Sequence, residues 1–323
     1  VVLGAKPVEV YAILGGQWPH SSFMIPGGVM CAPTLTDITR SIAILDFWRQ
    51  EFLEKQLLGC SVDRYLELKT WEDLLAWCDE NESQHNSDLA FFIRYSQEIG
   101  LDRYGAGYGN YLATGTFFEP SHYATPTIDG RNDALITRSG IYAGGEWSAF
   151  DHLRVTEDVT HSYFKGTGSL HPWDGVTEPL DPEEGKRQGK YTWAKAPRYD
   201  VAGKGHVPLE VGPLARQVIA GNPDHHPWQT YDPLIKDCLD KIGPSIFLRT
   251  LARLHAAPKY YEMTRRWIDQ IDLHDRFYIK PVERESGKGF GATEAARGAL
   301  ADWIVLEDGK IANYQVITPT AWN

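Results

Sequence analysis

Cysteine is scarce in this sequence, and its four copies are scattered. Cys31, Cys60, Cys78 and Cys238 form no C-x-x-C pair, the spacing that zinc ribbons and iron–sulfur sites require. Their apolar neighbours predict buried free thiols in a reducing compartment. The sequence also lacks the P-loop motif, the H-E-x-x-H motif of zinc peptidases and the G-x-S-x-G motif of hydrolases. These common classes of catalytic site are therefore excluded.

Long apolar runs and an excess of basic charge are absent as well. No apolar run approaches the ~20 residues of a membrane helix, and the start shows no basic region or small-residue cleavage site of a signal peptide. The net charge of −11, with dispersed lysines and arginines, argues against nucleic acid as a partner. The 323 residues, 42% of them hydrophobic, suffice for a large core. A start without methionine predicts an internal segment of a longer polypeptide.

Helix signals are clear in three stretches. Residues Thr36–Gly59 are predicted to form a helix that is capped by Thr36 and ended by Gly59. Ser87 is predicted to cap a second helix that runs to residue 100. Ser245–Ile271 predicts one or two helices, which Pro258 should break or bend.

Strand and loop signals dominate elsewhere. Ala134–Phe150 and Lys190–Ala196 have the composition of strands or extended loops, and the charged stretch 181–190 reads as a solvent loop. Trp303–Val316 alternates apolar and polar residues around Asp308-Gly309, which predicts a tight hairpin. The predicted fold class is mainly α (α+β): a single domain, residues 1–323, with a helical core, a small β-rich insertion and a C-terminal β-hairpin.

Arg297 lies in a turn that is rich in glycine and alanine, within the sequence GKGFGATEAARGAL. On the residues alone, it could equally be an exposed arginine of a surface helix. The small neighbours allow close backbone approach, and a guanidinium offers five donors and a permanent charge to an anionic ligand. Gly287, Gly289 and Gly291 lack the G-x-G-x-x-G spacing, so dinucleotide binding is disfavoured.

Four stretches carry a family resemblance in the same order along the chain. They are GGQWPHSSFMIPGGV at 15–29, HSYFKGTGSLHPWDGVTEP at 161–179, YTWAKAPRYD with EVGPLAR between 191 and 216, and the C-terminal segment 287–323. Together they resemble the large, catalytic subunit of nickel-iron hydrogenases. The resemblance implies the helical core of that subunit as the fold.

The resemblance assigns a role to the C-terminal segment. Arg297 matches the arginine that lies over the open face of the nickel-iron centre and donates to an iron-bound cyanide. The resemblance therefore implies that Arg297 is a catalytic residue. The family usually has proline just before this arginine, whereas Ala296 stands here. Thr320, which follows Pro319, matches a Ser or Thr that donates to the second cyanide. The residues alone also allow a strand-end threonine with a local backbone hydrogen bond.

Three further positions take roles from the resemblance. The backbone carbonyl of Val316 matches a ligand of a structural magnesium ion. Lys195 matches a lysine in the polar surroundings of that ion, although Lys195 and Arg198 could also be a basic surface pair. His20 matches a histidine near the proximal iron–sulfur cluster of the partner subunit, whereas a lone histidine is often only structural. His161, His171 and the pair His225-His226 are interpreted as structural.

The family holds its Ni-Fe(CN)2(CO) centre through two C-x-x-C pairs, and both are absent from these residues. The nickel and iron ligands are therefore expected outside this segment, and the segment alone is expected to be inactive. The implied function is H2 oxidation to protons and electrons by a nickel-iron uptake hydrogenase, with electrons passing to an iron–sulfur small subunit in a higher heterodimer oligomer. The alternative is a nickel-free electron-transfer scaffold related to the quinone-reducing subunit of respiratory complex I. The expected location is cytoplasmic, or at a membrane through partner subunits.

Overall fold

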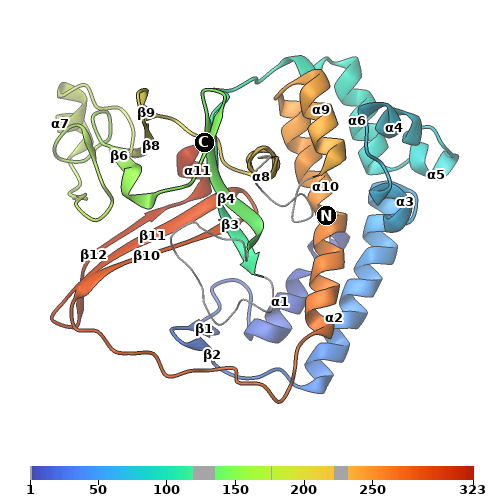
Figure 1. The fold of residues 1–323 in the computed structure, drawn as a ribbon, viewed down its shortest axis with the longest axis horizontal. Helices are drawn as coiled ribbons and strands as arrows, with labels where there is room; N and C mark the ends of the chain where they lie inside the picture. Colours follow the sequence, from blue (N-terminus) through green and yellow to red (C-terminus); the bar gives the residue numbers. More distant parts are fainter. Residues whose placement is uncertain (1, 119–134, 176, 222–231) are drawn as a thin grey trace. The chain divides into compact units, whose positions relative to one another are not determined.

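The computed structural model describes residues 2–118, 135–175, 177–221 and 232–323 (Figure 1). The chain forms two compact units. Unit 1 contains Val1–Tyr104 and Ile246–Glu283, and unit 2 contains Gly105–Ser245 and Arg284–Asn323. Two compact units can still fold as one domain, so the single-domain expectation stays a prediction. Helices take 41% and strands 24% of the described residues, so the fold is mixed, and the mainly α prediction underestimated the strands.

Unit 1 is built from helices and one two-stranded ribbon. Its elements are the short 3₁₀ helices η1 (Leu3–Ala5) and η3 (Leu101–Arg103), the π-helical segment η2 (Arg49–Leu58), the helices α1 (Val8–Gly15), α2 (Leu35–Trp48), α3 (Val62–Leu66), α4 (Trp71–Trp77), α5 (Glu82–His85), α6 (Asp88–Glu98) and α10 (Ile246–Asp269), and the antiparallel strands β1 (Met24–Ile25) and β2 (Gly28–Val29).

The start of α2 differs from the prediction by two residues. Thr34, rather than Thr36, is the N-cap, because its side chain accepts from the backbone N–H of Asp37 and the Asp37 carboxylate accepts from the N–H of Thr34 at 2.9 Å. This reciprocal pair is a capping box. The helix continues directly into η2 and ends at Gly59, which has a positive φ of 68° as predicted.

The other two predicted helices are present. Ser87 caps α6, since its hydroxyl oxygen accepts from the N–H of Ala90 at 3.3 Å. Helix α10 runs without a break through Pro258, so one helix is present of the one or two predicted, and a bend at Pro258 stays a prediction. Proline removes one helical hydrogen bond, but Phe247, Leu251 and Tyr261 are buried on either side of Pro258. Their packing keeps the helix continuous.

In its described residues, unit 2 contains three antiparallel sheets and short helices. One sheet has the order β3-β4-β5, the second β7-β6-β8-β9 and the third β10-β11-β12. The strands are β3 (Tyr111–Phe118), β4 (Leu135–Ala143), β5 (Glu146–Ser148), β6 (Val155–Asp158), β7 (Ser169–Leu170), β8 (Ala196–Val201), β9 (Gly205–Val207), β10 (Gly287–Ala295), β11 (Gly298–Glu307) and β12 (Lys310–Ile317). The helices are α7 (Pro182–Arg187), α8 (Pro213–Ala220), α9 (Pro233–Ile242), α11 (Pro319–Trp322) and the 3₁₀ helix η5 (His152–Arg154).

Two local predictions in unit 2 need correction. The C-terminal hairpin has a third strand, because β10 pairs with β11 along its whole length (Figure 1). The predicted turn at Asp308-Gly309 is confirmed. The stretch 181–190 contains helix α7 instead of only a loop. Asp181 accepts from two backbone N–H groups as the N-cap, and Pro182 occupies the first turn, a combination that favours a helix start.

One apolar cluster forms the centre of unit 2 beneath the C-terminal sheet. Its members come from all three sheets and from α11, and they include Leu112, Ile141, Val155, Tyr199, Val211, Ala299, Trp303, Ile317 and Trp322. The cluster packs the loop before α8 against β11, β12 and α11. This packing supports the turn between β10 and β11 and the start of α11.

The cysteines only partly match the prediction. All four are free thiols; Cys78 and Cys238 are buried, Cys60 is half-buried and Cys31 is exposed. Burial raises the pKa of Cys78 to about 12. Within the described residues, no helix combines the length and the apolar character that crossing a membrane would need.

Candidate functional site

Arg297 lies in a two-residue turn that joins β10 to β11. Ala295 and Gly298 pair across the base of the turn, and Ala296 and Arg297 form its tip with exposed side chains. The alternative of a surface helix is therefore wrong. Over the described part of the chain, the structure shows no hydrogen bond or ion pair of the Arg297 guanidinium. The arginine is thus presented at an exposed turn with its donors available.

The backbone of this turn lies directly against the start of α8. Gly298 has a φ of 130°, and a Cβ atom there would come within 2.6 Å of the Gly212 nitrogen. A Cβ atom on Gly212, whose φ is 126°, would lie 3.1 Å from the carbonyl oxygen of Arg297. Glycine is needed at both positions for this approach, since other residues rarely adopt such φ values.

The C-terminal helix α11 meets the same loop. Asn323 accepts from the backbone N–H of Val211 at 3.0 Å and donates to the Val211 carbonyl at 3.2 Å. Pro319 is buried at the first position of α11, and Thr320 is exposed in its first turn. Thr320 therefore does not end a strand. The structure brings the helix of Thr320 and the turn of Arg297 to one loop, at Val211–Gly212.

A buried ion pair lies behind the turn. Arg216 of α8 donates to the Glu294 carboxylate of β10 at 2.9 Å, and the two side chains are 6% and 1% exposed. Burial raises the pKa of Glu294, and the Arg216 charge acts in the opposite direction. Sequence patterns did not predict this pair. Its signal was a charged residue inside the apolar run PLARQVIA, since buried charges are normally paired.

Lys195 belongs to a second polar group in unit 2, and Val316 lies on β12 with an exposed side chain. Lys195 lies 3.6 Å from the Glu157 carboxylate, both side chains are nearly buried, and its ammonium donates to Thr177 at 2.7 Å. It is therefore not part of a basic surface pair. Gln315, next to Val316 on β12, hydrogen-bonds Glu157 as well. Burial raises the pKa of Glu157, and Lys195 and Gln315 act in the opposite direction.

His20 belongs to unit 1, whereas the residues above belong to unit 2. It follows a cis peptide bond between Trp18 and Pro19 and has a positive φ of 59°. The Gln17 amide donates to the backbone carbonyl of His20 at 2.7 Å. The His20 side chain is exposed, as are those of Trp18 in the same loop and of Met24 at the start of β1. An exposed loop with apolar side chains is typical of a contact surface.

His171 has the structural role that was expected. Its Nε2–H donates to the carbonyl of His152 at 3.1 Å, and its Nδ1 accepts from the Trp173 backbone at 3.1 Å. These bonds need a neutral ring, and burial lowers the pKa of both His152 and His171. His161 stacks on Tyr191. His225 and His226 lie outside the described residues.

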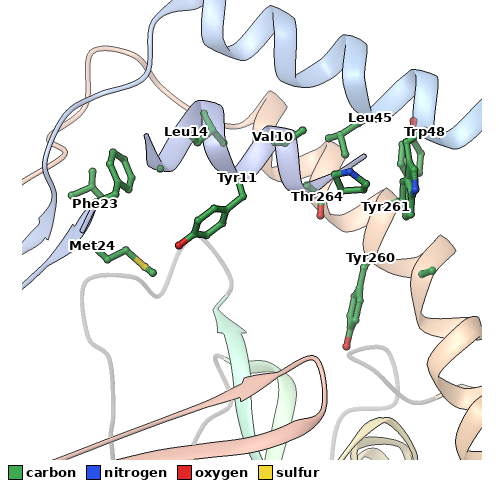
Figure 2. Close-up of a pocket in the computed structure, with 14 residues that line it drawn as sticks. Val10, Tyr11, Leu14, Phe23, Met24, Leu45, Trp48, Tyr260, Tyr261 and Thr264 are labelled. Carbon is green, nitrogen blue, oxygen red and sulfur yellow. The ribbon is translucent and has the colours of Figure 1, made fainter. Parts of the chain in front are cut away.

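Unit 1 also contains an apolar pocket of about 570 Å³. Figure 2 shows side chains of three helices among those that line the pocket: Val10 and Leu14 of α1, Leu45 and Trp48 of α2, and Tyr260 and Thr264 of α10. The lining offers no acid, histidine or lysine.

The comparisons with known proteins identify the family. The family model described as "Nickel-dependent hydrogenase" matches residues 3–323. The chain belongs to the nickel-dependent hydrogenase family. It is 31% identical over 355 residues to the uptake hydrogenase large subunit of Bradyrhizobium diazoefficiens, covering 98% of this chain and 54% of that protein. It is 32% identical over 367 residues to the corresponding subunit of Azotobacter chroococcum, with the same coverage.

A solved structure supports the same relationship. The reduced, active form of the Ni-Fe-Se hydrogenase from Desulfomicrobium baculatum superposes with a TM-score of 0.72 at 26% identity, covering 100% of this chain and 60% of that one. The chain thus spans about half the length of the curated relatives that it matches.

The residues of this hydrogenase-family chain do not by themselves fit a nickel-iron centre. Nickel and iron in such a centre need soft thiolate ligands. Three of the four cysteines lie in unit 1 and one in unit 2, and the described residues hold no group of three or more His, Cys, Asp or Glu side chains that could bind a metal ion. What the chain offers around such a centre is therefore charge, hydrogen-bond donors and a packed support.

Proposed function

We propose that this chain is the core of the large, catalytic subunit of a nickel-iron uptake hydrogenase, which oxidises H2 to protons and electrons. The observation that carries the proposal is the exposed Arg297 turn, mounted with α11 on the Val211–Gly212 loop of a chain whose relatives are uptake hydrogenase large subunits. These relatives favour the hydrogenase over a nickel-free scaffold.

Each predicted residue takes a part in this proposal. Arg297 supplies a fixed positive charge and N–H donors to an anionic ligand of the metal centre, because a charge that is already in place stabilises developing charge effectively. Thr320 supplies a second donor, while Ala296 and Pro319 shape the backbone on either side. The metal ligands come from cysteines outside residues 1–323.

The second polar group takes a supporting part. Val316 offers its backbone carbonyl to a magnesium ion, and the Lys195–Glu157–Gln315 group orders the surroundings of that ion. Carbonyl and carboxylate oxygens together with water are the ligands that magnesium prefers. Magnesium at this position is part of the proposal.

His20 and its exposed loop form the contact with an iron–sulfur small subunit, through which electrons leave the enzyme. A hydrogen bond from a histidine to a cluster sulfur would tune the reduction potential of the cluster. Attachment to a membrane, where it occurs, would be through such partner subunits.

An assay of H2-dependent dye reduction tests the proposal. The complete gene product is purified together with its partner subunit and supplied with H2 and an oxidised viologen or methylene blue. H2-dependent reduction that is lost without H2 supports the hydrogenase. A pure, nickel-free complex that never reduces the dye would instead point to the scaffold.

A further inference from the structure

The Arg297 turn has little in its own sequence to hold it in one geometry. Its tip is a pair of exposed residues, Ala296 and Arg297, and alanine leaves the backbone more freedom than a proline would. A long arginine side chain on a loose turn would sample many positions. A catalytic charge needs fixed geometry, so the support has to come from residues behind the turn.

Arg216 and Glu294 are placed to give this support. Glu294 lies two residues before the tip, and its carboxylate receives hydrogen bonds from Arg216 at 2.9 Å and from the backbone N–H and hydroxyl of Thr114 at 2.8 and 3.2 Å. The carboxylate is thus tied both to α8 and to β3. Charge-assisted hydrogen bonds of this kind are the stronger ones.

Arg216 also holds the turn backbone directly. The same nitrogen, Nη1, donates to the carbonyl of Ala295 at 3.1 Å. Ala295 pairs with Gly298 at the position where the two strands enter the turn. Gly212, which immediately precedes α8 and lies four residues before Arg216, closely approaches the backbone of Arg297 and Gly298. Helix α8 and the glycine before it therefore contact the turn at two places, at Ala295 and at the backbone of Arg297 and Gly298.

We propose that Arg216 and Glu294 are positioning residues that set the orientation of Arg297. The expected effect of the pair on catalysis rests on the proposed function. The expected effect of the pair on the geometry of the turn does not depend on that function. A pair that served only as part of the core would change stability without acting through Arg297. The two roles are separated by asking whether the effect of the pair survives once Arg297 has been replaced.

The first experiment measures the turn by amide hydrogen exchange, in the complete protein with its partner. Glu294→Gln keeps the shape of the side chain but removes its charge, so exchange in the peptide spanning residues 290–300 should become at least about tenfold faster. Glu178→Gln is the matched control, because Glu178 forms an exposed ion pair with Lys165 in the same unit. Unchanged exchange at the turn in Glu294→Gln would overturn the proposal.

The second experiment is a double-variant cycle on H2 oxidation. Glu294→Gln should lower kcat by about 10- to 100-fold, as a small misplacement of a catalytic group does, while nickel content and the KM for the dye stay unchanged. In an Arg297→Lys background, adding Glu294→Gln should lower kcat hardly any further, because the pair acts through Arg297. Fully additive losses would show a merely structural role and refute the proposal.

A milder variant covers the case in which Glu294→Gln does not assemble. Thr114→Val removes a hydroxyl donor that is shared between the Thr293 carbonyl at 2.9 Å and the Glu294 carboxylate at 3.2 Å, but it keeps the backbone N–H bond to Glu294. It should therefore speed exchange at the turn and lower kcat by only a few-fold. The loss should again vanish in the Arg297→Lys background. If the unaltered complex shows no H2 oxidation, the proposed function fails, and the exchange data still decide whether the pair positions the turn.

Discussion

At the residue scale, the candidate site consists of one exposed guanidinium and the buried charged groups behind it. Arg297 stands at the tip of a turn, whereas Arg216 and Glu294 lie buried beneath it. The sequence predicted the turn, because its glycines and alanines are local signals. It did not predict the ion pair, since the two partners lie 78 positions apart and only the fold joins them.

Replacing Arg297 by lysine should abolish most turnover in the complete enzyme. Lysine keeps the positive charge but lacks the planar fork of five donors, and loss of one positioned donor in a charge-stabilising site costs about 10²-fold or more in kcat. Steady-state H2 oxidation measures the loss, with nickel content as the control for assembly. Near-normal kcat in a variant with full nickel content would remove Arg297 from the proposed chemistry.

The His152–His171 group predicts acid sensitivity. Burial holds the pKa of His171 below its ordinary value of 6.5, so the unfolded chain binds the proton more readily than the folded one. The stability that this group contributes is present above pH 6.5 and is lost as the pH falls through the lowered pKa. Thermal unfolding at a series of pH values should show this fall.

The variant His171→Asn provides the check on that prediction. Without the buried imidazole, the melting temperature should depend less on pH between the ordinary pKa and more acidic conditions. If the variant and the original chain show equal pH slopes, another group is responsible for the acid sensitivity.

At the element scale, local capping signals explain both the successes and the errors. Ser87 and Gly59 were recognised because each residue alone suits its position at a helix end. Thr34 and Thr36 both precede the apolar stripe of α2, and only the reciprocal bond with Asp37 distinguishes them. The continuous α10 shows the opposite case, in which tertiary packing overrides the local signal of Pro258.

The capping box of α2 can be tested with a matched pair of variants. Thr34→Ala removes the side-chain acceptor of the Asp37 N–H and should lower the free energy of unfolding by about 1 kcal/mol. Thr36→Ala changes an exposed residue inside the helix and should be close to neutral. Urea unfolding measures both, and an equal or larger loss in Thr36→Ala would contradict the assignment of the cap.

At the scale of the whole molecule, the ordered motifs predicted the family, and the family model and the solved structure confirm it. Local patterns could not give the division into two units or the third strand of the C-terminal sheet. The division depends on contacts between distant segments, such as β3 with α8, whereas the third strand is joined to β11 by a turn of two residues, and its many glycines and alanines conceal the strand pattern. The roles of His20, Thr320, Lys195 and Val316 stay predictions.

Nickel binding by the 323 residues alone should be absent. The chain has four cysteines without a C-x-x-C pair, and the described residues hold no cluster of metal-binding side chains. After incubation with nickel and desalting, the purified chain should retain no stoichiometric metal. Retention of one tightly bound nickel ion that cysteine alkylation removes would show a ligand set that this account lacks.

Metal analysis combined with infrared spectroscopy of the complete protein and its partner tests the central claim most directly. The account predicts stoichiometric nickel, iron beyond that of the partner's clusters, and absorption bands of iron-bound carbon monoxide and cyanide. It also predicts that the cyanide bands shift in Arg297→Lys. A fully assembled complex without nickel and without those bands would contradict the hydrogenase assignment.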